Sequence, residues 1–416
     1  MLRSASPEVE LLVRCVHPSG KFGEVDSVRE LLAGDLDWEQ LLELGEAHGV
    51  TPLLHQTLTA QRQDRSKEAT TDGLACTVPE SVHDRLAEQV RSIAVRNVHI
   101  TTEMQTLLDS FEEHDIRALP FKGPVLAAFA YGDVGFREFG DLDLLVCRED
   151  ITEAVDVLES HGYTWEDVPR LDDSALLGGP FTKALVPEYE LHRENLTVEV
   201  RWRVGDPDRP FPPSVDTLWK RRETVEVAGT DVDVLAPEDR LLVLAFHGTK
   251  HNWHLLKWVC DFAATLEQTD VVWSRLLGRA RQHRVERKLL VGIALVDGLF
   301  GADIPVWVRD RLVADQRAIP LAEQVVEGFC SGTPTRPTRA ERITFNARAS
   351  DSVGDSLRAV LYHSRFHPGE PEYQLLPLSG PLHPLYYLVL PVRLLADRSL
   401  SLRRDAQTEY TGRRND

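Results

Sequence analysis

Two aspartates that lie two positions apart give the sequence its clearest chemical signal. Asp141 and Asp143 open the run DLDLLV, whose alternating start predicts a strand. Side chains at positions i and i+2 of a strand point to the same face, with Cα atoms roughly 6.5–7 Å apart. Carboxylates placed in this way suit a shared Mg²⁺ or Mn²⁺ ion. The pair therefore predicts a metal site, with a solvated acidic strand start as the alternative.

A glycine turn precedes this strand and is suited to holding phosphate. The apolar run IRALPF predicts a short strand, Lys122-Gly123 ends it, and Pro124 suits the first turn of a following helix. Glycine lets the backbone approach a phosphate, and a helix N-terminus offers N–H groups at the positive end of its dipole. The order of these elements predicts a compact site for phosphate and metal.

A third carboxylate lies farther along the chain, in the strand-like segment LTVEVRW. Alternation places Thr197, Glu199 and Arg201 on one face of this strand and the apolar residues between them on the other. If the strand lies beside the one that carries Asp141, Glu199 completes a triad able to hold two metal ions. The alternative is a cross-strand ion pair between Glu199 and an arginine.

A later helical segment, HGTKHNWHLLKW, carries two histidines and a lysine. His247 and His251 are four residues apart and share a helix face, but the glutamate of the zinc-binding HExxH pattern is absent. Lys250 is predicted to reach a phosphate from this helix, with packing between helices as the alternative. Trp253 and Trp258 are predicted to be core residues, with base stacking by Trp253 as the alternative.

Composition limits the partners. The chain has 416 residues, with 47 Lys and Arg against 66 Asp and Glu, and a formal net charge of −19. So large a negative charge repels phosphate backbones, so we expect no binding to long nucleic acids. Arginine greatly outnumbers lysine. An acidic, lysine-poor composition is a hint of a salt-rich cytoplasm, where ions screen the repulsion.

The cysteine pattern predicts a cytoplasmic protein with reduced thiols. No CxxC pair is formed by the five cysteines, Cys15, Cys76, Cys147, Cys260 and Cys330. Acidic residues stand near the N-terminus, where a signal peptide would be apolar. We expect no membrane span. The apolar segment over residues 385–396 is expected to pack on the protein, with weak contact to a membrane surface as the alternative.

Changes in residue pattern predict an α+β protein in four parts. Residues 1–95 are expected to be helical, residues 96–235 to form a small mixed sheet with helices, and residues 236–330 to form a second helical domain. Residues 331–416 are expected to be a linker and tail, with an exposed Thr-, Pro- and Arg-rich stretch over 331–350 and an apolar helix near 383–397.

Two long motifs resemble a known superfamily. FKGPVLAAFAYGDVGFREFGDLDLLV resembles the nucleotidyltransferases with the DNA polymerase β-like fold, and most of all an uncharacterised branch with a Lys-Gly and Gly-Asp-x-Asp signature. LAPEDRLLVLAFHGTKHNWHLLKWVCDFAATL is similar to the same branch, whose members carry a His-Gly-x-Lys-His-x-Trp helix followed by Trp-x-x-Asp. The resemblance covers residues 38–265, with a weaker echo in HPLYYLVLPVRLL.

This resemblance implies a reaction and a catalytic triad. A nucleoside monophosphate would pass from an NTP, such as ATP, to the hydroxyl of a small molecule or a protein, with release of pyrophosphate. Asp141 and Asp143 would bind Mg²⁺ or Mn²⁺. Glu199 would be the third metal-binding carboxylate and would activate the attacking hydroxyl.

The resemblance also implies a nucleotide-binding set. Gly123 would cradle the triphosphate, and the side chains predicted to bind phosphate or to line the nucleotide site are Lys122, Arg137, His247, Lys250 and His251. The superfamily usually has Gly-Ser or Gly-Gly at this turn, so the proline that follows Gly123 here removes a backbone donor and a hydroxyl.

Two other functions fit parts of the same pattern. A glycosyltransferase also uses a DxD motif to hold a metal and a sugar nucleotide. In such an enzyme the motif normally follows a nucleotide-binding βαβ region, whereas the first hundred residues here are predicted to be helical. A catalytically silent nucleotide-binding or assembly module of the same fold is the second alternative, to which the Gly123-Pro124 turn gives weight and the intact triad does not.

Overall fold

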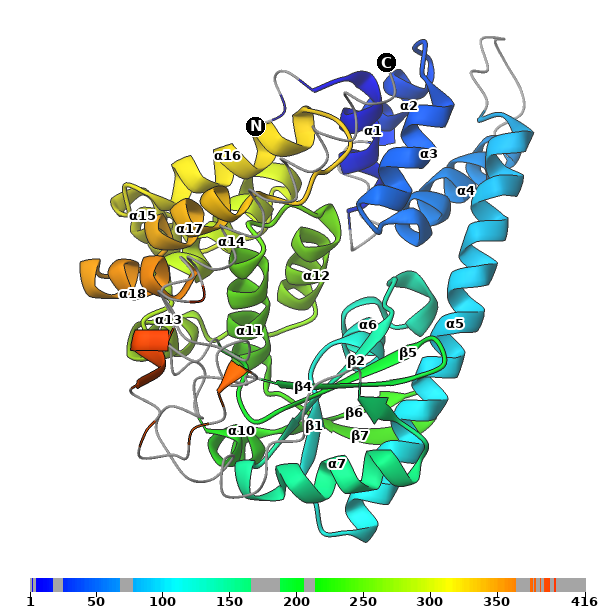
Figure 1. The fold of residues 1–416 in the computed structure, drawn as a ribbon. Coiled ribbons are helices and arrows are strands. Elements are labelled where there is room, and N and C mark those ends of the chain that lie inside the picture. The colour runs from blue at the N-terminus through cyan, green and yellow to red at the C-terminus, as the bar shows by residue number, and fades with distance from the viewer. Residues whose placement is uncertain are drawn as a thin grey trace, which may run out of the picture.

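The computed structural model describes residues 2, 5–17, 25–67, 78–165, 188–205 and 214–363, and isolated positions between 375 and 393. Figure 1 shows a small sheet with helices on both sides and the long helix α5 (Glu80–Glu113) running along one edge of the molecule. This mixed arrangement with helical flanks confirms the predicted α+β class.

A five-stranded sheet lies at the centre, in the order β1-β2-β5-β4-β3. The β2–β5 pair is parallel, and the other three neighbouring pairs are antiparallel. The strands are β1 (Ala118–Pro120), β2 (Asp141–Val146), β3 (Thr164–Trp165), β4 (Glu188–Arg193) and β5 (Leu196–Arg201). The strands predicted at IRALPF, DLDLLV and LTVEVRW are therefore confirmed.

Parallel pairing of β2 with β5 sets the faces of the sheet. Asp141 pairs with Thr197, and Asp143 pairs with Glu199. Along β5, buried residues alternate with half-buried ones, so the valines face the core and Glu199 faces away from it. The condition on which the predicted triad depended, that the Glu199 strand lies beside the Asp141 strand, is therefore met.

Helices cover the two faces of the sheet differently. Figure 1 shows α7 (Ile151–Ser160) beneath the sheet, and α6 (Gly123–Tyr131), α11 (Pro237–Lys250) and α12 (Leu256–Glu267) above it. One core joins α5 and α7 to the lower face and includes Leu142, Leu144, Val198 and Val200. The polar residues of β2 and β5 therefore face α6 and α11.

Short elements and a hairpin complete the central part. The two 3₁₀ turns, η1 (Val134–Phe136) and η2 (Arg148–Asp150), flank β2. Helix α10 (Val215–Arg221) leads into the antiparallel hairpin of β6 (Glu223–Val227) and β7 (Thr230–Val234).

Helices from both ends of the chain share a second core, which also includes Leu119 and Phe121 beside the sheet. The N-terminal helices are α1 (Pro7–Cys15), α2 (Val25–Leu32), α3 (Trp38–Ala47) and α4 (Thr51–Lys67). The later helices are α13 (Trp273–Gln282), α14 (Glu286–Phe300), α15 (Val306–Ala314), α16 (Ala318–Cys330), α17 (Arg339–Arg348) and α18 (Val353–His363). The predicted domain boundaries stay a prediction.

The stretch over residues 331–350 is not the exposed linker that its composition predicts. Helix α17 occupies residues 339–348 and begins with a capping box in which Thr338 and Glu341 bond each other's backbone N–H groups. Phe345 and Ala349 are buried in the shared core. The composition of this stretch did not indicate the helix, because its polar residues outnumber the two apolar residues that anchor it in the core.

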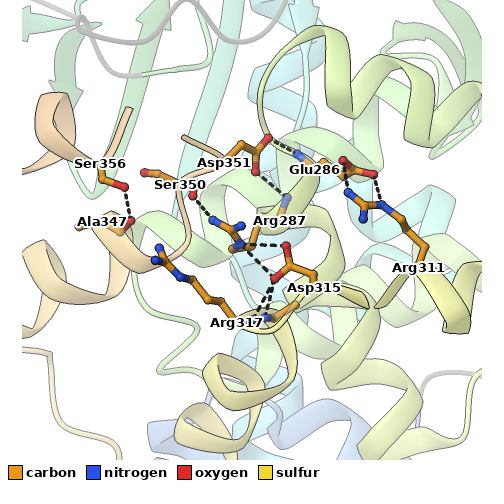
Figure 2. A network of polar contacts seen from close by, with 10 residues as sticks. Glu286, Arg287, Arg311, Asp315, Arg317, Ala347, Ser350, Asp351 and Ser356 are labelled. Atoms are coloured by element: carbon orange, nitrogen blue, oxygen red, sulfur yellow. Dashed lines mark hydrogen bonds and ion pairs between the residues drawn. The ribbon is translucent and has the colours of Figure 1, made fainter. Parts of the chain in front are cut away.

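A half-buried carboxylate from the α17–α18 connection, that of Asp351, caps α14, as Figure 2 shows. Asp351 accepts hydrogen bonds from the backbone N–H groups of Glu286 (2.9 Å) and Arg287 (2.8 Å). Arg287 Nε in turn donates to Asp315 at 3.0 Å, and Arg311 donates to Glu286 at 2.8 Å. The N-cap residue of α14 makes no side-chain cap of its own, so Asp351 satisfies the first N–H groups of that helix instead. Together these contacts link α14 to α15 and to the α17–α18 connection.

The described cysteines are free thiols, as expected: Cys15, Cys147, Cys260 and Cys330. Cys76 lies outside the described residues. Across the part of the chain that the structure describes, no helix combines the length and the apolar character needed to cross a bilayer. Most of the apolar helix expected near 383–397 also lies outside the described residues, although residues 386–389 are helical. The membrane contact and the cytoplasmic location stay predictions.

His48 fastens the N-terminal helices to α12. Its ring Nδ1 accepts a hydrogen bond from the backbone N–H of Leu256 at 3.2 Å, and its carbonyl accepts one from Lys257 at 3.3 Å. Burial, together with the nearby His254, lowers the pKa of His48 to about 4. The imidazole is therefore neutral in the folded protein at neutral pH, as an accepting Nδ1 requires.

This contact predicts a loss of stability in acid. A depressed pKa in the folded state gives stability that is complete above the unfolded value, near pH 6.5, and is lost as the pH falls to about 4. His48→Asn keeps an accepting oxygen but cannot titrate. Urea unfolding at pH 7, 5.5 and 4 should show that the free energy advantage of the wild type over His48→Asn falls by up to about 3 kcal/mol. A difference that does not vary with pH would contradict this account.

Candidate functional site

Asp143 lies at the centre of a buried charge cluster. Its carboxylate oxygens are both 2.8 Å from Lys122 Nζ, and Arg201 Nε is 3.5 Å from one of them. The Asp143 side chain is 1% exposed and that of Lys122 is 11% exposed. Arg201 also pairs with Glu199, so an arginine ion pair does form, but within β5 itself and not across strands as the alternative had it.

The two acids that face each other across β2 and β5 have pKa values shifted in opposite directions. Burial alone would raise the pKa of Asp143, but the charges of Lys122 and Arg201 outweigh it and hold the value below its usual range. Burial and the charge of Asp143 raise the pKa of Glu199 to about 7. At neutral pH, Asp143 is therefore ionised and Glu199 takes up and releases a proton readily.

A cavity of about 590 Å³ opens beside these carboxylates, between the sheet and helices α11 and α12. Its charged and aromatic lining includes Lys122, Arg137, Asp141, Glu199, Arg201, His247, Lys250, His251, Lys257 and Trp258. All the predicted nucleotide-binding side chains therefore line one space, together with two of the three predicted acids. Asp143 lies just behind Lys122.

The glycine of the predicted phosphate turn has a clear structural role. Gly123 has a φ of +56°, a left-handed conformation that costs little only for glycine. A Cβ at this position would lie 3.3 Å from the carbonyl oxygen of Asp141. Gly123 therefore lets the turn between β1 and α6 pack against the start of β2, which brings Lys122 to Asp143.

Arg137 is held in the cavity wall by the aspartate of the Trp-x-x-Asp motif. Its Nε donates to Asp261 at 2.9 Å, and Tyr131 donates its hydroxyl to the same carboxylate oxygen at 3.0 Å. Arg137 and Asp261 are both buried, at 8% and 1% exposed. The two sequence motifs that are far apart in the chain therefore meet through this ion pair.

Helix α11 contributes an aromatic and histidine-rich wall. The Trp258 ring centre lies 5.4 Å from that of His247 and 5.2 Å from that of His251. Burial and the neighbouring cations, Lys122 first among them, lower the pKa of His247, so its ring is neutral at neutral pH. Trp258 packs against the core, as predicted, but it is half-buried and also lines the cavity, which the prediction did not include. Trp253 is fully buried, as predicted.

The structure does not draw three carboxylates together as a ready metal cage. Among the described residues, the one triple of His, Cys, Asp or Glu whose donor atoms come within 4.8 Å of one another is Cys147, Glu149 and Asp216. Arg117 pairs with the first and last of these, at 3.0 Å from each. No such triple among the described residues includes His247 and His251. The predicted triad of Asp141, Asp143 and Glu199 fits a metal through its oxygen ligands and its shared face of the sheet, and not through a cluster that is already drawn together.

Several lining residues were not in the predicted site, among them Arg201, Glu190 and Lys257. Arg201 follows Glu199 by two positions, so the period of a strand could have marked it as a site residue. Glu190 lies on β4 directly opposite Glu199 and follows the same rule. Lys257 gave no comparable signal. Burial and the nearby Arg137 lower its pKa, and it reaches the cavity because α12 folds back along α11.

The fold and the site define a protein whose small mixed sheet presents acids to a cation-lined cavity. The chain belongs to the family described as uncharacterised nucleotidyltransferase, whose model matches residues 34–301. This result confirms the resemblance noted in the two motifs and identifies the chain as a nucleotidyltransferase of that family.

Comparison with individual proteins adds little detail. No curated protein matches the chain. Among solved structures, the chain is similar to the solution structure of the antibiotic-resistance factor ANT(2'')-Ia, with a TM-score of 0.28 and 13% sequence identity, over 45% of this chain and 98% of that one.

The His-Gly-x-Lys-His-x-Trp motif also has a packing function. A Cβ on Gly248 would lie 2.4–2.5 Å from the ring of Trp253, which turns back on the helix through left-handed backbone at Asn252 and Trp253. The backbone N–H of Trp253 donates to the carbonyl of Gly248 at 2.7 Å. This tight turn ends α11 and fixes the cavity-facing end of the helix.

Gly248→Ala should therefore destabilise the protein by at least about 2 kcal/mol, because the fully buried indole has no room to move. Gly278→Ala, in helix α13, is the matched control, since no atom lies within 4 Å of its added Cβ. That change should be neutral or stabilising by up to about 1 kcal/mol. Equal midpoints for the two variants in urea unfolding would show that the Gly248 contact is not tight.

Proposed function

We propose that the protein transfers a nucleoside monophosphate from an NTP to a hydroxyl group, with Mg²⁺ or Mn²⁺, and releases pyrophosphate. The observation that supports this most strongly is the register of β2 and β5. It sets Glu199 opposite Asp143, on the same face as Asp141 and at the wall of a cavity large enough for a nucleotide. The acceptor is a small molecule or a protein hydroxyl.

The cations of the cavity support the binding of a polyphosphate. Lys122, Arg137, Arg201, Lys250 and Lys257 line it together with four carboxylates, so in a chain whose formal net charge is −19 this space gathers at least as many cations as acids. Negative charge is attracted to such a concentration of cations. In this proposal the lysines carry most of the contact with the phosphates, and Arg137 stays fixed by Asp261.

Asp141, Asp143 and Glu199 would hold the metal through their oxygens, which are the ligands that Mg²⁺ prefers. When bound, the metal would neutralise negative charge on the triphosphate and orient it. Asp143 suits this role because one of its two buried oxygens has no well-aligned hydrogen-bond donor.

The residues of the chain would then act on the reacting atoms. The acceptor oxygen forms a bond to the α-phosphorus as the bond between that phosphorus and the bridging oxygen of the β-phosphate breaks. Pyrophosphate leaves with the electron pair of the broken bond, and the cavity lysines stabilise its charge. The proton of the acceptor hydroxyl passes to a carboxylate oxygen of Glu199, which faces the cavity from the central strand β5.

The wall formed by Trp258 and the two histidines supports binding of the nucleobase. Imidazole and indole rings offer flat faces for stacking, and both histidines and Trp258 line the same cavity as the cations. Stacking of a base on an aromatic side chain contributes about 1–3 kcal/mol. In this proposal, phosphates lie toward the lysines and the base lies against Trp258.

Thermal unfolding with each of the four NTPs, with and without Mg²⁺ or Mn²⁺, tests the donor and the metal. A nucleotide that binds the folded protein should raise the midpoint by a few degrees, and the rise should require the metal. Asp141→Asn should abolish the metal-dependent part and lower pyrophosphate release at least about a hundredfold. Asp141 is the chosen variant because Asp143 supports buried cations. Absence of any shift with all four NTPs would favour a catalytically silent module.

A second pair of variants tests the base-binding wall. Trp258→Leu should weaken NTP binding about tenfold or more, whereas Trp258→Phe should keep most of the affinity, because only the first removes the aromatic face. Tripolyphosphate, which has no base, is the control ligand and should bind both variants as it binds the wild type. Equal losses for tripolyphosphate and NTP would assign Trp258 a structural role instead.

A further inference from the structure

Lys122 occupies the place that a metal bound to Asp143 would need. Its ammonium group lies 2.8 Å from both carboxylate oxygens, and both side chains are almost wholly buried. Mg²⁺ binds carboxylate oxygens at about 2.0–2.1 Å and keeps a shell of further oxygen ligands around itself. An ammonium group so close to both oxygens leaves no space for that shell.

Charge repulsion also opposes the simultaneous presence of the Lys122 ammonium and a metal ion at Asp143. Arg201 Nε already lies 3.5 Å from Asp143, so this single carboxylate faces two positive groups. A metal ion would add two more positive charges to a buried site, where like charges repel far more than they do in water. Lys122 must therefore leave Asp143 before a metal can bind there.

The carboxylates that line the cavity differ from Asp143 as partners for the displaced ammonium. Glu199 is paired with Arg201, Glu138 is paired with Arg96, and the half-buried Asp141 is itself a predicted metal ligand. Glu190 lies one strand farther from β2, and Lys250 and Lys257 in the same lining repel an ammonium group. A polyphosphate placed in the cavity would supply the missing negative charge.

We propose that Lys122 makes binding of the metal and of the nucleotide cooperative. Without nucleotide, Lys122 neutralises Asp143 and keeps a divalent ion out. When a triphosphate enters, the ammonium moves from the carboxylate to a phosphate oxygen, and Asp143 becomes available to the metal. This inference rests on the proposed function, and it adds that Lys122 is a positioning residue that acts as an internal substitute for the metal.

Binding of Mn²⁺ alone, measured from the loss of its free-ion signal in electron paramagnetic resonance, tests the proposal without turnover. The wild type should bind Mn²⁺ weakly when no nucleotide is present. Lys122→Met removes the competing charge and should bind Mn²⁺ about tenfold or more tightly than the wild type, a change in the usual range of coupling between sites. Lys122→Arg keeps a positive charge and should bind as weakly as the wild type.

Two controls make the result specific. Lys220→Met removes an exposed lysine on α10 that does not line the cavity, and its binding of Mn²⁺ alone should match the wild type. Asp143→Asn in the Lys122→Met background should lose the tight binding. If Lys122→Met does not fold, as its circular dichroism would show, Lys122→Gln replaces it with the same expected gain.

The outcomes separate this inference from the proposed function. Equal or weaker Mn²⁺ binding by the folded Lys122 variant overturns the inference, even if the wild type still releases pyrophosphate from an NTP. Tight binding of Mn²⁺ by the wild type without nucleotide overturns it as well. A wild type that binds no NTP with or without metal defeats the proposed function instead, whatever the Lys122 variant does.

Discussion

Parallel pairing of β2 with β5 is the constraint on which the rest of the site depends. This pairing sets Asp143 opposite Glu199 and turns both toward the cavity, while the apolar residues between them enter the lower core. A slip of one residue would send the acids into that core. Because the apolar residues of β2 and β5 must face the lower core, the charged residues between them must face the opposite side of the sheet. The packing of α5 and α7 against the lower face therefore holds the acids in position.

Placing several acids on one face of a sheet creates repulsion that the structure must balance. The cations Lys122 and Arg201 neutralise the carboxylate of Asp143. In the same way, the carboxylate of Asp261 neutralises Arg137, which lines the same cavity. Buried ion pairs of this kind add little net stability, but loss of one partner leaves a costly unpaired charge. The metal-free site is thus close to neutral at its centre, and the half-buried Lys250 and Lys257 line the cavity beside it.

The two long motifs of the sequence serve both structure and site. Gly123 and Gly248 are each required by close contacts, with the carbonyl of Asp141 and with the ring of Trp253. Each glycine holds a charged neighbour at the cavity, Lys122 in one case and Lys250 in the other. Helix α12, which His48 fastens to the N-terminal helices, adds Lys257 and Trp258. Helices from both ends of the chain therefore support a cavity wall that the sheet alone could not build.

The sequence by itself determined the strands, the acidic pair, the third carboxylate and the two motifs, because local alternation and spacing follow from backbone geometry. It also marked Lys122, Arg137, His247, Lys250 and His251, all of which line the cavity. It could not determine that β5 lies beside β2, that Lys122 pairs with Asp143, or that Trp258 rather than Trp253 faces the cavity. Nor did composition reveal helix α17, whose two buried anchors are hidden among polar residues. These features depend on contacts between segments far apart in the chain, and such contacts are decided by how whole elements pack together.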